Sequence, residues 1–263
     1  MRVPSLLGAT ALVCAVSIGC SNTSVGPSQA GVPALPPQSS MSIPSIAPTG
    51  LGKVSAVNST IAVTLAYQAV RYWTVNVRES LRDPAALFAL CHNNAAAVAL
   101  GDNSGYTWEV GNTVFHAALI GRVESDSARW SMTVSGGGLS NFTWYRGTST
   151  ITGNAGYWDF YDTSLVNGVH PAVIRMSYNA SGDDGTFKVA VVNSADSSFG
   201  SYLSWTSSGT SKSFSAFNAP KSEQISIRWN DLTEAGTLEN VATGEKACWD
   251  SETNGHADIP CVE

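Results

Sequence analysis

The side chains best suited to covalent chemistry are a cysteine and the histidine that follows it, Cys91 and His92. A catalytic thiol needs a base within hydrogen-bond reach of its sulfur. Successive residues of a helix point about 100° apart, and this pair lies in a segment with helical periodicity. We therefore expect Cys91 to be buried as a small apolar residue and not to act as a nucleophile.

The other reactive groups are explained better by turns than by catalysis. The Gly101–Gly105 segment loosely resembles the nucleophile loop of serine proteases, but Asn103 breaks the order of that loop and a turn before a strand is expected. Asp183 and Asp184 lie between glycines, where Asp is favoured by turn geometry, and they supply too few carboxylates for calcium. The histidines show no metal-ligand spacing; they are His92, His116, His170 and His256. The sequence predicts no catalytic residue, no metal site and no cofactor.

The N-terminus has the pattern of an export signal. Arg2 precedes an apolar run, Leu6 to Ile18, which is shorter than the about 20 residues of a membrane-spanning helix but fits the apolar region of a signal peptide. The following Gly19 and Cys20 resemble the lipobox of bacterial lipoproteins, although Ser17 stands where that family usually has an aliphatic residue. The resemblance implies a signal peptide over 1–19 and acyl chains on Cys20. An ordinary signal with an unmodified Cys20 is the alternative.

No charged residue occurs between Arg2 and Lys53, and residues 21–50 are rich in Pro, Ser and Gly. Such a composition buries too little apolar surface to offset the entropy of ordering. We expect residues 20–50 to form a lipidated, semi-extended tether and residues 51–263 to form one folded domain. Ser21 replaces the Asp that marks inner-membrane retention in some bacteria, so the lipobox resemblance favours the outer membrane.

The folded domain is predicted to be α+β and mainly β. A helical part, about 57–95, contains two segments, the second of which begins at Asp83 and Pro84, an N-cap residue followed by proline at the first helical position. From about 105 to 261, apolar and polar residues alternate in short runs separated by Gly, Asn, Ser and Asp. This pattern predicts an antiparallel up-and-down meander of ten or more strands that forms a curved sheet, a half-barrel or a closed barrel around the helices.

The C-terminal cysteines are predicted to form a disulfide. Asn254 and Gly255 form a strong type I′ turn signal, and a hairpin centred on them places Cys248 opposite Cys261 at a non-hydrogen-bonded pair. Pro260 does not fit that ladder because it has no N–H. A zinc site with the nearby His256 would lack a fourth ligand. A disulfide is compatible with an exported protein.

Aromatic residues recur along the predicted strands. The tryptophans concerned are Trp130, Trp144, Trp158, Trp205 and Trp229. They either fill the core or line a concavity that binds an apolar or glycan ligand. In outline such a domain is similar to half-barrel envelope lipoproteins that carry lipids or hydrophobic factors.

Charge restricts the partners. Charged residues make up 13% of the chain and the net charge is −6, which excludes a basic nucleic-acid binder. From Lys221 onward there are three basic and nine acidic residues, so this end should face away from anionic lipid headgroups. We expect a membrane-anchored envelope lipoprotein that binds a ligand or an envelope partner without catalysis. A structural or assembly lipoprotein and an envelope hydrolase are the alternatives; the hydrolase would need a histidine and a carboxylate near Cys91 or Ser104.

Overall fold

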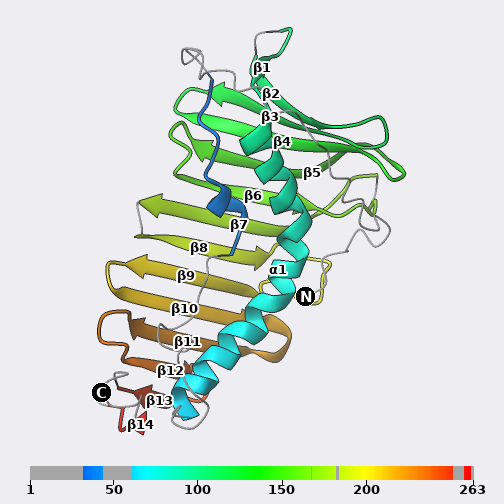
Figure 1. Ribbon diagram of the computed structural model, residues 1–263. Coiled ribbons are helices and arrows are strands. Elements are labelled where there is room, and N and C mark those ends of the chain that lie inside the picture. The colour runs from blue at the N-terminus through cyan, green and yellow to red at the C-terminus, as the bar shows by residue number, and fades with distance from the viewer. Residues whose placement is uncertain are drawn as a thin grey trace.

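The computed structural model describes residues 32–43, 61–102, 104–166, 168–181, 184–250 and 258–261. Within these residues the chain forms one sheet of 14 antiparallel strands, each paired with its neighbours in sequence (Figure 1). The strands are β1 (Val98–Ala99), β2 (Tyr106–Gly111), β3 (His116–Glu124), β4 (Ser127–Gly136), β5 (Leu139–Thr150), β6 (Ala155–Tyr161), β7 (Ala172–Ser181), β8 (Asp184–Val191), β9 (Tyr202–Ser208), β10 (Ser211–Asn218), β11 (Glu223–Asn230), β12 (Gly236–Asn240), β13 (Glu245–Trp249) and β14 (Asp258–Ile259). A short 3-10 helix, η2 (Ala219–Lys221), joins β10 to β11. The predicted meander is confirmed as an open sheet with β1 and β14 at its edges.

The helical part of the domain is one long helix, α1 (Ile61–Asn94), that joins the two helical segments predicted from the sequence. Pro84 lies inside α1, where it removes one backbone hydrogen bond. Its side chain is buried, so packing against the core stabilises the continuous helix. The buried side chains recur at helical spacing along one face; they are Ala66, Val70, Val77, Leu81, Phe88 and Cys91.

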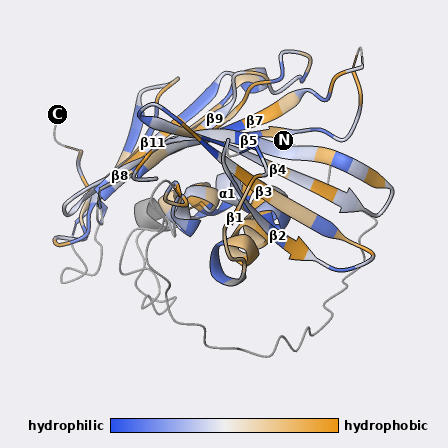
Figure 2. Cartoon of the chain, turned by 90° about the horizontal axis from the view of Figure 1, so that it is seen from above, coloured by the Kyte–Doolittle hydropathy of each residue, from blue (hydrophilic) through white to orange (hydrophobic). Residues whose placement is uncertain are grey.

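The core lies between α1 and one face of the sheet. Seen end-on, the sheet arches over the helix (Figure 2). The pairing register places a continuous apolar row on this inner face, comprising Leu119, Met132, Tyr145, Phe160, Ile174 and Val191. Phe88 of α1 meets Trp158 of β6 edge-on, with ring centroids 5.5 Å apart. Alternation along each strand therefore separates this apolar face from an outer polar face.

Glycines make room for three of the buried tryptophans. Gly121 pairs with Trp130, Gly147 with Trp158 and Gly236 with Trp249. A Cβ atom on each glycine would lie 2.2–2.5 Å from the indole ring of its partner. Each indole thus lies across the backbone of the neighbouring strand, which a larger residue would prevent.

The expectation of a tether over residues 20–50 is wrong for residues 32–43, which pack on the same face of the sheet as α1 (Figure 1). A short 3-10 helix, η1 (Gln38–Met41), buries Ser40 and Met41, and Ile43 is also buried. Trp158 Nε1 donates a hydrogen bond of 3.2 Å to Ser40 Oγ. The average composition of the segment concealed these apolar side chains. They gain enough burial against the sheet to fix the chain.

The predicted disulfide between Cys248 and Cys261 is confirmed, with a Cα–Cα distance of 5.3 Å. The predicted hairpin register is wrong by two residues, because Cys248 pairs with Ile259 and not with Cys261. Pro260 therefore lies just beyond the ladder, where its missing N–H costs nothing. The predicted turn at Asn254 and Gly255 lies outside the described residues.

Candidate binding surface on the outer face of the sheet

The face of the sheet opposite α1 is polar and rich in hydroxyl groups. One row in register across five strands consists of Ser177, Lys188, Ser204, Ser215 and Ser226. Neither α1 nor residues 32–43 cover this face, because both lie on the apolar side. It is the broadest surface on which the described part of the chain could meet a ligand.

The centre of this face carries an ion pair between β6 and β7. Asp159 and Arg175 are paired residues of the two strands. The Arg175 guanidinium donates two hydrogen bonds of 2.7 Å to the two carboxylate oxygens of Asp159. These bonds raise the pKa of Arg175. The Asp159 side chain is 13% exposed and that of Arg175 is 47% exposed, so the pair presents mainly its guanidinium to solvent.

Two tyrosines flank this pair, each under an arginine. The Arg175 guanidinium lies 4.5 Å from the centre of the Tyr157 ring, and that of Arg146 lies 5.8 Å from the Tyr161 ring. Burial is the main cause that raises the pKa of Tyr161, and Arg146 opposes it. The Tyr161 phenol therefore stays neutral near pH 7, and the rings of Tyr157 and Tyr161 each make a cation–π contact.

The same arrangement continues toward β10. Lys188 Nζ lies 4.7 Å from the centre of the Tyr202 ring, and the Tyr202 and Phe217 rings are 5.9 Å apart. Gln224 donates a hydrogen bond of 3.3 Å to the Tyr202 hydroxyl. We call the whole set the aromatic–cationic strip; it comprises Arg146, Tyr157, Asp159, Tyr161, Arg175, Lys188, Tyr202 and Phe217. It combines three cations with one anion in a chain whose net charge is −6.

An open groove of about 670 Å³ lies at strands β9 to β14 and shares no lining residue with the strip. Its floor includes one row of the outer face, formed by Thr206, Ser213, Arg228 and Thr237. Trp229 and Trp249 also line it. The groove thus offers hydroxyl groups and one guanidinium to a ligand, whereas Trp229 and Trp249 are buried and expose almost no indole surface.

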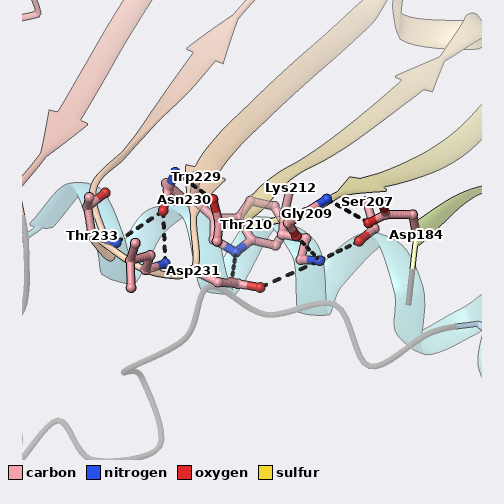
Figure 3. Close-up of polar contacts among 10 residues, drawn as sticks. Asp184, Ser207, Gly209, Thr210, Lys212, Trp229, Asn230, Asp231 and Thr233 are labelled. Carbon is pink, nitrogen blue, oxygen red and sulfur yellow. Dashed lines mark hydrogen bonds and ion pairs between the residues drawn. The ribbon is translucent and has the colours of Figure 1, made fainter. Parts of the chain in front are cut away.

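A polar cluster at the strand ends fixes one wall of this groove (Figure 3). The Lys212 ammonium donates hydrogen bonds to Ser207 Oγ and, over 2.9 Å, to the carbonyl of Gly209, and it lies 3.8 Å from the Asp231 carboxylate. Trp229 Nε1 donates to the same carboxylate over 2.9 Å. Asp231 follows β11, so these bonds hold the β9–β10 turn against it. The contacts of Lys212 favour a structural role for its ammonium group.

Neighbouring turns are held in a similar way. Asn230 Oδ1 accepts hydrogen bonds from the backbone N–H groups of Leu232 and Thr233, of 2.8 and 3.1 Å. Asp184 Oδ1 accepts one of 2.6 Å from the N–H of Gly209 (Figure 3). Asp184 is the first residue of β8, so the prediction that it lies in the loop before that strand is wrong, and its carboxylate binds the neighbouring β9–β10 turn instead. Asp183 lies outside the described residues.

The tryptophans proposed as ligand residues lie mainly in the core. Trp130 and Trp158 are buried under α1 and residues 32–43, so they line no cavity, and that part of the ligand hypothesis is wrong. Trp144 and Trp205 are half-buried, and only Trp229 of the five also borders the groove. The concave side of the sheet is occupied by α1 and residues 32–43, as the predicted curved sheet around the helical part implies for α1.

The tyrosines of the strip were a weaker signal in the sequence. Tyr157 and Tyr161 alternate with Trp158 and Phe160 along β6, so the two sets must face opposite sides of the sheet. The side without the tryptophans is the one that solvent reaches. Alternation could therefore have identified these tyrosines, which are half-buried, as the aromatic residues of the outer face.

The remaining candidate residues lie apart from the strip and the groove. Cys91 is fully buried, desolvation raises the pKa of its thiol to about 11, and its Sγ lies 3.7 Å from the carbonyl oxygen of Trp108 as a donor. The His92 ring contacts Gln38 at 3.5 Å. Ser104 donates through its N–H and its hydroxyl to Asp102, as expected for a turn. Both His92 and Ser104 thus have local partners.

Two features of the described side chains and helices bear on metal and membrane binding. No cluster there brings together three or more His, Cys, Asp or Glu side chains that could hold a metal ion. Within the same residues no helix has the length and hydrophobicity needed to span a membrane. Cys20 and His256 lie outside the described part of the chain.

Comparison with known proteins finds no matching family model, no similar curated protein and no similar solved structure. The function must therefore be argued from the surface itself.

Proposed function

We propose that the protein is a lipid-anchored envelope protein that binds an acidic glycan on the outer face of its sheet. The observation that carries this proposal is the aromatic–cationic strip, in which three cations stack on three tyrosines of an uncovered face. The anchor is supported by the lipobox at Cys20 and by the export signal before it.

The chemistry of the strip matches a sugar polymer with carboxylates. Tyrosine rings offer flat apolar faces to sugar rings, and the surrounding serines and threonines can exchange hydrogen bonds with sugar hydroxyls. Arginine pairs well with carboxylates because its guanidinium forms two parallel hydrogen bonds. An apolar ligand is less compatible, since the concave side of the sheet is occupied by α1 and residues 32–43.

Binding of defined polysaccharides tests the proposal. Isothermal titration calorimetry of the detergent-solubilised protein should detect polygalacturonate, which carries carboxylates, and not the neutral polymer dextran. Tyr157→Ala and Arg146→Ala should each weaken binding roughly tenfold, because a charged hydrogen bond or a ring contact of about 1.4 kcal/mol is lost. Added salt should weaken it further, since exposed charges are screened.

Arg82→Ala is the matched control. This residue is an exposed arginine of α1 on the other side of the sheet, so its loss changes the net charge equally but leaves the strip intact. If both polymers bind alike, or if neither binds, the glycan proposal fails. The structural or assembly lipoprotein is then favoured, with its tryptophans as core residues.

The anchor has its own test. Cys20→Ala should abolish incorporation of radiolabelled palmitate and release processed protein from the membrane fraction. Palmitate-free wild-type protein would contradict the lipobox interpretation, whatever the outcome of the glycan titration.

A further inference from the structure

The connection between β6 and β7 forms an ordered hairpin with an aliphatic tip. Val166 and Val169 form a two-way backbone bridge, with N–H to carbonyl distances of 2.9 and 3.0 Å. At the base, the N–H of Asp162 donates to the carbonyl of Pro171 over 3.0 Å, and the Asp162 carboxylate accepts the N–H of Ser164 over 2.9 Å. The hairpin is therefore held in shape by its own hydrogen bonds.

The tip of this hairpin exposes apolar side chains in spite of its order. Leu165, Val166 and Val169 are each more than half exposed. No charged residue occurs from 163 to 169. We call Leu165, Val166 and Val169 the β6–β7 tip. Insertion of such a tip into an apolar phase would desolvate no charge and would order little additional chain.

Two other connections at the same end of the sheet expose apolar residues. Because the strands alternate in direction, the connections that follow β2, β6 and β8 all lie at one end. Val114 after β2 and Phe199 after β8 are each more than half exposed. Their loops are also held by side-chain turns: Asn112 accepts the N–H of Val114, and Asp196 accepts the N–H of Ser198.

The opposite end of the sheet differs in its charge. Its most exposed apolar residue is Leu232 among the described residues. Leu232 stands between Asp231 and Glu234 in sequence, so its insertion into an apolar phase would bring carboxylates close to that phase. The Leu232 turn thus differs from the β6–β7 tip, since no charged residue occurs from 163 to 169.

We propose that the β6–β7 tip contacts the lipid bilayer and inserts into its headgroup and acyl boundary. This inference rests on the proposed function in that the anchor keeps the protein at a membrane. Three aliphatic side chains fall far short of the roughly 800 Å² that each partner of a stable protein interface buries. A small tip is sufficient at a bilayer, because tethering raises the effective concentration of the second contact.

Environment-sensitive labels test this placement in the full-length protein. Val166→Cys and Leu232→Cys are each labelled with the fluorophore NBD. Cys91 is buried and Cys248 is in a disulfide, so the unsubstituted chain serves as the labelling blank. The proteins are reconstituted in vesicles of phosphatidylethanolamine and phosphatidylglycerol, with or without bromine atoms on the upper acyl chain.

The emission of the label at position 166 should shift to the blue. Bromolipid should quench this label at least about twofold more than the label at 232, since interfacial side chains reach roughly 5–10 Å into the boundary. Equal responses at the two positions would overturn the proposal. A label at 166 that becomes buried only as the protein concentration rises would indicate self-association and would also overturn it.

Flotation of the same vesicles separates this inference from the anchor. If the protein floats but its label at 166 stays in water, the anchor is supported and insertion of the β6–β7 tip is contradicted. If the protein floats only at high lipid concentration but its label at 166 responds to lipid, insertion of the tip is supported and the anchor is contradicted. Protein that never floats contradicts both.

Discussion

Replacement of Tyr145 by phenylalanine should make the protein more stable. The Tyr145 side chain is fully buried, and its hydroxyl has no hydrogen-bond partner among the described residues. Burial raises the pKa of this phenol well above its usual value, with a smaller effect from Cys91. A buried hydroxyl without a partner costs about 1–3 kcal/mol, and Tyr145→Phe removes that cost.

The packing of the ring should survive the substitution. The Tyr145 ring lies 5.5 Å from that of Trp158 and 5.6 Å from that of Phe160, and phenylalanine keeps both contacts. The void left by one oxygen atom costs only a few tenths of a kcal/mol at about 24 cal/mol per Å³. The free energy of unfolding should therefore rise by about 1–2 kcal/mol, and Tm by roughly 2–4 °C for each kcal/mol.

Urea unfolding followed by tryptophan fluorescence measures this change, and Tyr178→Phe is the matched control. The Tyr178 hydroxyl is also buried but donates a hydrogen bond of 3.2 Å to the carbonyl of Gly153. Its loss should lower the free energy of unfolding by about 1 kcal/mol. If the two variants change stability in the same direction, the unsatisfied hydroxyl is not what distinguishes Tyr145, and the reasoning is refuted.

Three further substitutions and one control have defined outcomes. Cys248→Ser opens the disulfide and should lower the free energy of unfolding by about 3 kcal/mol on the chain-entropy model; in urea titrations, reducing agent should then have no further effect. Gly147→Ala would place a Cβ atom 2.4 Å from the Trp158 ring and should cost about 1–3 kcal/mol. Gly101→Ala is the control, because nothing lies within 4 Å of the added atom, and it should be nearly neutral. Thermal melts compare the two variants, and an equal loss of stability in both would contradict the packing argument. Burial raises the pKa of Cys91 from 9.0 to about 11. Between these pH values the unfolded chain has released a proton that the folded protein retains, so the free energy of unfolding falls as the pH rises. Cys91→Ala should make the free energy of unfolding depend less on pH in this range, as measured by urea titrations at several pH values. An unchanged pH dependence would contradict the role assigned to Cys91.

The fold could be predicted largely because its information is local. Alternation along each strand and the short connections between strands define a meander without any long-range pairing. The disulfide could be predicted for the same reason, since Cys248 and Cys261 lie in one hairpin. The register of that hairpin was predicted wrongly: Cys248 pairs with Ile259, and the missing N–H of Pro260 was the sequence feature that argued against the predicted register. The packing of Met41 was missed since it depends on a partner surface more than 100 residues away, at Trp158.

The site could be predicted only in part. Alternation shows that Tyr157 and Trp158 face opposite sides of the sheet, but it does not show which side the helix covers. A helix with one apolar stripe can pack on either face until the rest of the sheet exists. The ligand hypothesis for the tryptophans therefore depended on a long-range fact that the sequence pattern does not contain.

The diagonal course of α1 has a consequence for the order of folding. Consecutive hairpins can add one after another as the chain is made, since each strand pairs with the one before it. The helix is made before all of the strands, yet it contacts β2 and β3 as well as β12 and β13 (Figure 1). The first turns of α1 can pack only after the last hairpins of the sheet have formed. Until then the growing sheet exposes apolar surface that a chaperone could bind. The C-terminal disulfide links β13 to the chain just after β14, so it stabilises the last strands to form. Its oxidation should therefore be the step that commits the protein to its folded state.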